Sequence, residues 1–219
     1  MALVGAAVLA WLWFRDQTSV SLPDGAHLPM TGPLNEKPAL RTPLDPNGFP
    51  ALFNAALQVV EGPALMPDFA PGHSPVPPEP DDDYDLAARI FAMQAAVESD
   101  DGRAVYHFNM GNLTTAQGDY FLNPPSDTRH RYSVFLYPLQ GAVAQVERVK
   151  RLWPKAYKAA YSGSVTAFAH ELVPPGGLQY YEAPEKPYRD AMLARGKRFG
   201  WDSGVAGRGR PLAVVKRNC

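Results

Sequence analysis

The sequence lacks most residues that metal and redox sites require. Its single cysteine is Cys219, so it forms no intramolecular disulfide and no multi-cysteine metal site. None of the five histidines lies three or four positions from another, so no local histidine clamp is present. No glycine-rich loop ends in Gly-Lys-Ser/Thr, as a phosphate-binding loop does. We therefore expect no cofactor and no bound metal.

The sequence also lacks a large net charge of either sign. The net charge is −1, which gives no global field to attract nucleic acid. The charges are nevertheless segregated, because acidic residues dominate 61–101 and basic residues dominate 186–219. Blocks of opposite sign indicate either internal pairing or two different partner surfaces. We expect no nucleic-acid partner, and the sequence identifies no small-molecule substrate.

One uncharged hydrophobic run is present, at residues 1–14 before Arg15. A helix of this length spans roughly 21 Å, which is short for a bilayer core of about 30 Å. Tryptophans at its polar end favour the headgroup level. We predict a short membrane helix, with a packed N-terminal helix or a signal-peptide remnant as alternatives. The residues predicted to contact lipid are Leu3, Val4, Val8, Leu9, Trp11, Leu12, Trp13 and Phe14.

Proline is abundant, with 23 residues among 219. Proline removes a backbone donor and fixes φ, so the proline-rich segments are predicted to be extended arms. We predict a Pro-rich linker over 15–82 with a short helix near 50–60. An α/β domain then covers 83–200, and a basic, glycine-rich tail covers 201–219.

Hydrophobic periodicity predicts the elements of the domain. Helices are expected near 84–98 and 140–161, with a kink at Pro154, and near 188–198. Strands are expected near 103–110, 131–137 and 164–172, where β-formers are frequent. Residues 119–122 are a further short segment that could pair with a strand. A strand, a long helix and a strand in succession predict a small mixed sheet with a βαβ unit.

Candidate functional residues are few. His107 and His170, with Glu171 beside the latter, fall in predicted strands and form the best potential metal or general-base group if the fold brings them together. Tyr180, Tyr181 and Trp201 fall in loop-like segments, where such residues often anchor interfaces. Two arginines of the basic tail, Arg208 and Arg210, are further interaction candidates. The sequence shows no catalytic residue set.

These observations favour a non-catalytic accessory or structural subunit of a membrane-bound complex. The N-terminal helix would anchor it as a single-pass protein in an organellar or bacterial inner membrane. The extended arms would contact other subunits, because ordering such chain costs about 1–2 kcal/mol per residue that contacts must offset. A periplasmic adaptor or immunity-type binding protein is one alternative. A small enzyme or ligand-binding domain with a site near His107 and His170 is another.

Overall fold

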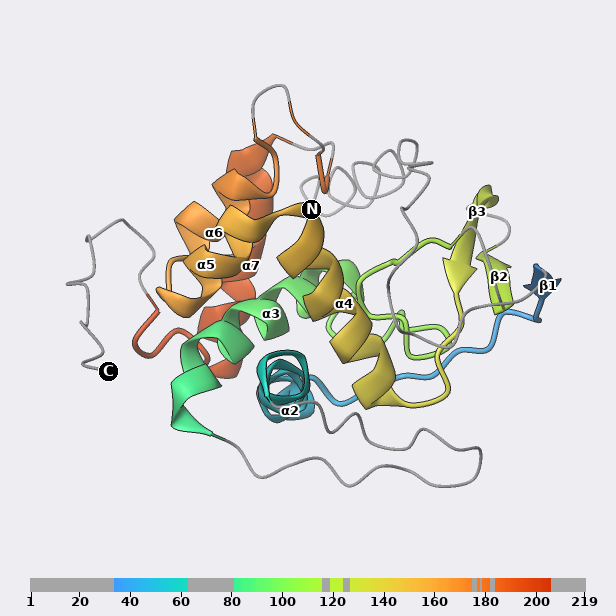
Figure 1. The fold of residues 1–219 in the computed structure, drawn as a ribbon, viewed down its shortest axis with the longest axis horizontal. Helices are drawn as coiled ribbons and strands as arrows, with labels where there is room; N and C mark the ends of the chain where they lie inside the picture. The colour runs from blue at the N-terminus through green and yellow to red at the C-terminus, as the bar shows by residue number, and fades with distance from the viewer. Residues whose placement is uncertain are drawn as a thin grey trace, which may run out of the picture.

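The computed structural model describes six helices and a small three-stranded mixed sheet (Figure 1). It describes residues 34–62, 81–115, 119–123, 127–174, 177, 179–181 and 184–205. The predicted membrane helix (1–14) and the tail arginines Arg208 and Arg210 lie outside these residues. No helix in the described ranges has both the length and the apolar character needed to cross a bilayer.

Along the chain, β1 comes first, and β2 and β3 lie between two groups of helices, α2 to α3 and α4 to α7. The strands are β1 Asn35–Glu36, β2 Asp119–Asn123 and β3 Asp127–Ser133. The helices are α2 Phe49–Glu61, α3 Asp85–Glu98, α4 Pro138–Leu152, α5 Pro154–Tyr161, α6 Val165–Glu171 and α7 Glu185–Phe199. Short 3-10 turns, η1 Pro46–Gly48 and η2 Asp82–Tyr84, precede α2 and α3.

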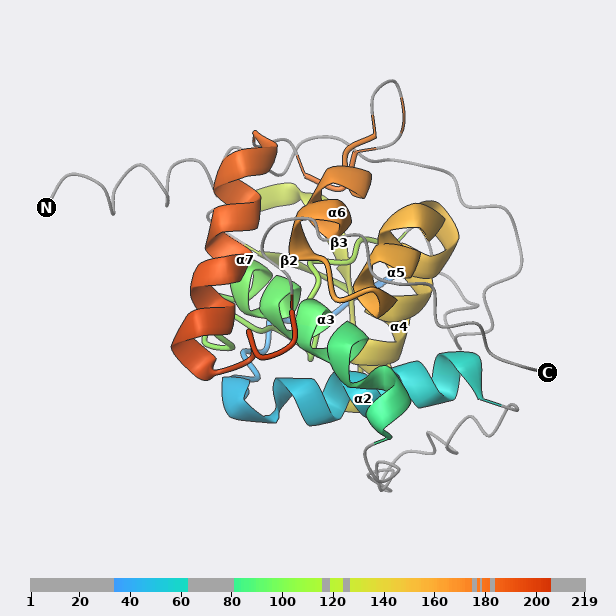
Figure 2. The ribbon, with the colours of Figure 1, turned by 90° about the vertical axis from the view of Figure 1, so that its left-hand side faces the viewer.

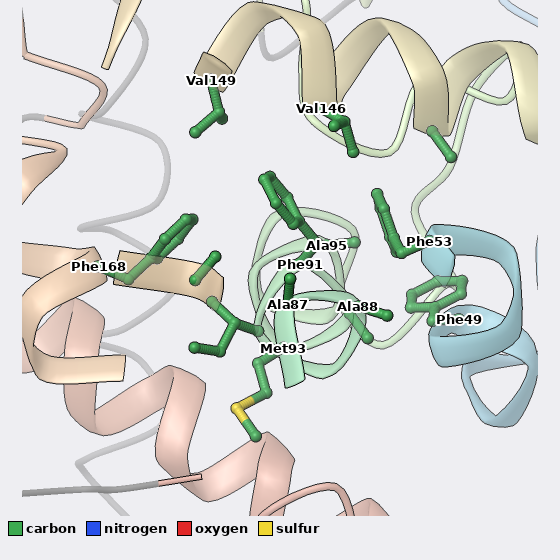
Figure 3. Close-up of a cluster of buried hydrophobic side chains, with 14 of the residues drawn as sticks. Phe49, Phe53, Ala87, Ala88, Phe91, Met93, Ala95, Val146, Val149 and Phe168 are labelled. Atoms are coloured by element: carbon green, nitrogen blue, oxygen red, sulfur yellow. The ribbon is translucent and has the colours of Figure 1, made fainter. Parts of the chain in front are cut away.

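Helix α3 lies at the centre of the helical part, with α2 and α7 on different sides of it (Figure 2). It confirms the helix predicted near 84–98. Its Ala-rich sequence is buried on almost every side, as expected for a central helix. The Phe91 ring lies between Phe53 of α2, 5.8 Å away, and Phe168 of α6, 5.6 Å away (Figure 3). These aromatic contacts join the first and second groups of helices in one core.

Residues 34–62, which fall in the predicted linker, contact the helices and loops of this chain. The predicted helix near 50–60 is confirmed as α2, which has Pro50 in its first turn, and its Phe53 and Leu57 are fully buried. Ahead of it, the extended chain follows the 102–107 loop, and the Leu44 amide donates to the Gly102 carbonyl at 3.0 Å. A Cβ on Gly102 would lie 2.2 Å from the Leu44 carbonyl oxygen, so this approach requires glycine.

The helix predicted over 140–161 is confirmed, together with its break. Helix α4 ends at Leu152, Trp153 leaves the helical region with φ −132° and ψ 64°, and α5 begins at Pro154. Proline has no amide hydrogen, so it fits the first turn of the second helix. The predicted final helix is confirmed as α7, which ends at Gly200 in the left-handed conformation (φ 72°).

The predicted βαβ unit is wrong. Residues 103–110 form a loop, because His107 and Phe108 have φ values of 48° and 53°, which a strand does not adopt. Residues 165–171 form α6, and the Ser164 hydroxyl caps it by accepting from the Ala167 amide at 3.2 Å. The β-formers in both segments gave a misleading signal.

The observed sheet is built differently. The predicted strand 131–137 is confirmed only in part, since β3 spans Asp127–Ser133 and the chain then turns into α4. Strand β2, at the predicted pairing segment, pairs antiparallel with β3 and parallel with β1. The coarse class, mixed α/β, is therefore correct, while the chain between the parallel strands β1 and β2 includes α2 and α3.

Candidate active site

The two histidines predicted to form a site have separate surroundings. His107 Nε2 lies 2.8 Å from the Pro38 carbonyl oxygen, and its ring is 5.1 Å from that of Phe121. His170, at the exposed end of α6, instead pairs through Nδ1 with Glu185 at 2.9 Å. Glu171 is the half-buried last residue of α6. Within the described ranges, no three His, Cys, Asp or Glu side chains form a group that could hold a metal ion.

The aromatic interaction candidates contact this chain. Trp201 is 6% exposed and stacks on Phe199 with ring centroids 4.8 Å apart. Tyr181 is buried, and its hydroxyl donates to the Ala169 carbonyl at 2.8 Å. Tyr180 is half-buried and donates to the Gly111 carbonyl at 3.2 Å. The surfaces that Trp201 and Tyr181 would offer to a partner are therefore covered by this chain itself.

A different residue, Glu98, stands out by its chemistry. It is the last residue of α3, and its carboxylate accepts from the Tyr188 hydroxyl at 2.8 Å and from the Asn112 amide at 3.1 Å. Burial raises its pKa above the ordinary 4.5, and this effect outweighs the two hydrogen bonds, which lower the pKa. The residue as a whole is only half-buried. Glu98 is therefore a desolvated acid on a residue that is half-buried as a whole.

The local backbone holds Glu98 in an unfavourable place for a negative charge. The C-terminal end of a helix carries partial negative charge, which disfavours a carboxylate there. The chain then turns through left-handed residues, with φ 50° at Asp100, 57° at Asp101 and 80° at Gly102. The Ser99 hydroxyl closes the turn by donating to Ala95 and accepting from the Gly102 amide. This turn fixes the direction of the Glu98 backbone.

Helix α7 forms ion pairs with the turn that follows α3 and provides the tyrosine that binds Glu98. Asp101 is 6% exposed and accepts from Arg195 at 3.1 Å and from Arg198. Tyr188, in the first turns of the same helix, donates to Glu98 and stacks on Tyr181 at 3.9 Å. Burial and then the Glu98 charge raise the pKa of Tyr188 far above its ordinary range, so its hydroxyl stays protonated as a donor. The acid and its donor are thus held by two separate attachments between α3 and α7.

Amide side chains extend the polar interior from α3 to α4. Gln94 lies one helical turn before Glu98. The side-chain amide of Gln145 on α4 donates to the side-chain oxygen of Gln94 at 3.1 Å. Both glutamines are fully buried, and each has one polar atom without a hydrogen-bond partner within the described part of the chain. A Cβ on Gly111 would lie 2.9 Å from the Gln145 side chain, so glycine makes room for this pair.

Sequence reasoning missed this group. In the sequence, Glu98 is only one member of the acidic block 61–101. The partners of Glu98 lie 14 and 90 residues away in the chain, so no local motif joins them. The available signal was a glutamate at the end of an alanine-rich helix.

Comparison with known proteins gives no match: no protein-family model, no curated protein and no solved structure is significantly similar to this chain. The function is therefore inferred from the site.

Proposed function

We propose that this protein is a hydrolase of glycosidic bonds in which Glu98 is the general acid. The observation that carries the proposal is a carboxyl group that is hydrogen-bonded to the neutral side chains of Tyr188 and Asn112 and whose pKa is raised by burial. Groups with a perturbed pKa concentrate at catalytic sites. Glycosidases require a carboxylic acid that remains protonated near neutral pH.

The reaction needs one proton at the bond that breaks. Glu98 would donate its proton to the glycosidic oxygen as the bond from that oxygen to the anomeric carbon breaks. Water supplies the hydroxyl that ends on the anomeric carbon, and its remaining proton restores the acid. A raised pKa supports this step because it increases the protonated fraction of the acid at any given pH.

The neighbours of Glu98 also fit a sugar ligand. The Tyr188 hydroxyl and the Asn112 side-chain amide contact it, and groups of these types match the donors and acceptors of sugar hydroxyls. The groups that shift the pKa of Glu98 are Tyr188 and Asn112, and neither is a cation. Glu98 therefore differs from a structural glutamate, whose charge an arginine or lysine neutralises.

Many glycosidases pair the acid with a second carboxylate about 5–9.5 Å away. No carboxylate is among the described groups that shift the pKa of Glu98. The proposal therefore assigns one role, proton donation, to one residue.

The full chain, kept in mild detergent, can be tested against a panel of neutral and acidic polysaccharides by the release of reducing ends. We expect cleavage of at least one polymer and a loss of about 100-fold or more with Glu98→Gln. Glu61→Gln is a matched control, because Glu61 also ends a helix and accepts from a tyrosine. Failure to cleave any polymer, or full activity of Glu98→Gln, would contradict the proposal.

The membrane-subunit interpretation remains a prediction, because the residues on which it depends, 1–14, lie outside the described part. The hydrolase proposal replaces the non-catalytic role expected from the sequence, whereas the predicted membrane attachment is compatible with a catalytic domain. Fractionation of cells expressing the full chain tests it independently of Glu98.

A further inference from the structure

Asn112 contacts Glu98 through a single nitrogen atom. Its Nδ2 atom lies 3.2 Å from the main-chain carbonyl oxygen of Glu98 and 3.1 Å from the side-chain oxygen Oε2. A carbonyl oxygen only accepts hydrogen bonds, so the atom that faces it must be the nitrogen of the amide and not its oxygen. Asn112 is therefore a donor to Oε2 and cannot accept a hydrogen from it through this atom.

The loop after Met110 holds Asn112 in this orientation. Asn112 has a left-handed backbone with φ 50°, which asparagine adopts more readily than most residues. The buried side chain of Asn109 closes the loop, because it accepts from the Leu113 amide and donates to the Leu113 carbonyl, both at 2.8 Å. The Asn112 side chain is thus fixed from its backbone as well as by its two bonds to Glu98.

The other carboxyl oxygen of Glu98 has a partner of a different kind. Oε1 lies 2.8 Å from the hydroxyl of Tyr188. An amide nitrogen can only donate, whereas a hydroxyl can donate or accept.

The two oxygens therefore differ as positions for the acidic proton. A proton on Oε2 would turn the acceptor of the Asn112 bond into a hydroxyl oxygen, which is a weaker acceptor, and the amide cannot reverse its direction. A proton on Oε1 leaves the Asn112 bond intact, because the Tyr188 hydroxyl can change from donor to acceptor. Weakening a hydrogen bond of a desolvated group is costly, so the hydrogen-bond pattern favours Oε1.

We infer that Asn112 places the acidic proton of Glu98 on Oε1, beside Tyr188, and keeps Oε2 as the carbonyl oxygen. Asn112 is then a positioning residue, since it acts through Glu98. The position of the proton follows from the hydrogen bonds, whereas its use in cleaving a glycosidic bond rests on the proposed function. In that reaction the O–H bond at Oε1 breaks, the proton bonds to the glycosidic oxygen, and the electron pair stays on the carboxylate, to which Asn112 continues to donate.

Infrared spectroscopy of the full chain tests this inference, because the C=O stretch of a neutral carboxyl group moves to higher wavenumber when its carbonyl oxygen loses a hydrogen bond. The spectrum is recorded at about pH 5, where carboxyl groups of ordinary pKa are mostly charged. The band that Glu98→Gln removes belongs to Glu98. The measured quantity is the shift of this band on Tyr188→Phe, both with Asn112 present and in Asn112→Gly, where glycine adopts the φ of 50° without strain.

We expect Tyr188→Phe to move the band little while Asn112 is present, since Tyr188 then contacts the hydroxyl oxygen of the acid. In the Asn112→Gly background the proton can lie on Oε2, and Oε1 becomes the carbonyl oxygen that accepts from Tyr188. Tyr188→Phe should then move the band clearly to higher wavenumber. Equal shifts in the two backgrounds, a larger shift while Asn112 is present, or the absence of any band that Glu98→Gln removes would overturn the inference.

Tyr157→Phe is the matched control, because the Tyr157 hydroxyl donates to Glu61 as that of Tyr188 donates to Glu98. It should leave the Glu98 band in place. Circular dichroism identifies a variant that has unfolded, and Asn112→Asp then replaces Asn112→Gly. Aspartate has a similar size and tolerates the left-handed backbone, but it presents a carboxylate that accepts a proton from Oε2. The Tyr188→Phe shift should again exceed the shift measured with Asn112 present.

The hydrolysis assay separates this inference from the proposed function. Cleavage that depends on Glu98, together with equal band shifts, leaves the general acid in place and overturns only the role of Asn112. The expected pattern of band shifts without cleavage of any polymer leaves the position of the proton in place and overturns the hydrolase.

Discussion

Glu61 and Glu98 occupy equivalent places in two packed helices but have opposite electrostatic surroundings. Each is the last residue of its helix, and each accepts a hydrogen bond from a tyrosine of a later helix, Tyr157 or Tyr188. Lys150 lies 3.0 Å from Glu61. No lysine or arginine is among the described groups that shift the pKa of Glu98.

The pKa values of the two carboxyl groups move in opposite directions for this reason. At Glu61, burial raises the pKa, but the bonds from Tyr157 and Lys150 and the charge of Lys150 together outweigh it, so the pKa is lowered. At Glu98, burial dominates and the pKa is raised. The comparison shows that a hydrogen bond from a tyrosine does not by itself decide whether the pKa of a glutamate is lowered or raised. At Glu61, Lys150 helps to reverse the effect of burial, whereas at the more deeply buried Glu98 no described cation does so.

The largest effect on stability is expected from Asp101→Ala, which releases the turn that follows Glu98. The change leaves Arg195 and Arg198 without their shared carboxylate, and we expect a loss of about 2–3 kcal/mol in the free energy of unfolding. Activity should fall as well, because Glu98 loses its fixed position. Chemical denaturation measures the first effect, and Asp100→Ala, at an exposed neighbour, is the control. Equal losses in the two variants would show that the Asp101 attachment does not position the site.

Tyr188→Phe sharpens the comparison at Glu98, the proposed general acid. The Tyr188 bond favours the charged form of Glu98, so its removal should raise the pKa of Glu98 further. The basic limb of the pH–rate profile should therefore move to higher pH, with a loss of about 1 kcal/mol in unfolding free energy. Tyr157→Phe should remove the bonds to Glu61 and Tyr161 and leave that limb in place. A shift to lower pH in Tyr188→Phe would contradict the assignment.

Lys150→Met is expected to make Glu61 resemble Glu98. Without the cation, burial should raise the pKa of Glu61 above 4.5, and stability should fall by about 0.5 kcal/mol, as is typical of exposed ion pairs. A lowered pKa stabilises the folded state above pH 4.5 and loses that effect as the pH falls through the folded value. The acid-induced loss attributable to Glu61 should therefore disappear in this variant. The measurement is thermal unfolding between pH 3 and pH 7, in steps of about one pH unit. A loss of stability at acid pH that is the same in Lys150→Met and in the unchanged protein would contradict the prediction.

The sequence predicted the helices better than the strands. Helix α3 has apolar residues at helical spacing, and the break before Pro154 follows from a missing amide hydrogen. The segment 103–110 alternates like a strand, but the left-handed backbone at His107 and Phe108 overrides that pattern. Such a conformation depends on the chain that lies on the loop, where the His107 amide donates to the Leu40 carbonyl at 2.9 Å.

The site could not be predicted from the sequence, because its chemistry arises from packing. The raised pKa of Glu98 depends on burial at the end of α3 and on a tyrosine 90 residues away. Histidines attracted attention in the sequence because of their ordinary pKa, whereas a glutamate becomes a candidate only when its surroundings are known.

The most direct test of this account is a residue-specific NMR titration of the side-chain carboxyl carbons in the full chain, with Glu98→Gln and Glu61→Gln used to assign the two signals. The account predicts that Glu98 titrates above pH 4.5 and Glu61 below it. A Glu98 signal that titrates at or below pH 4.5 would contradict the assignment of Glu98 as a desolvated general acid.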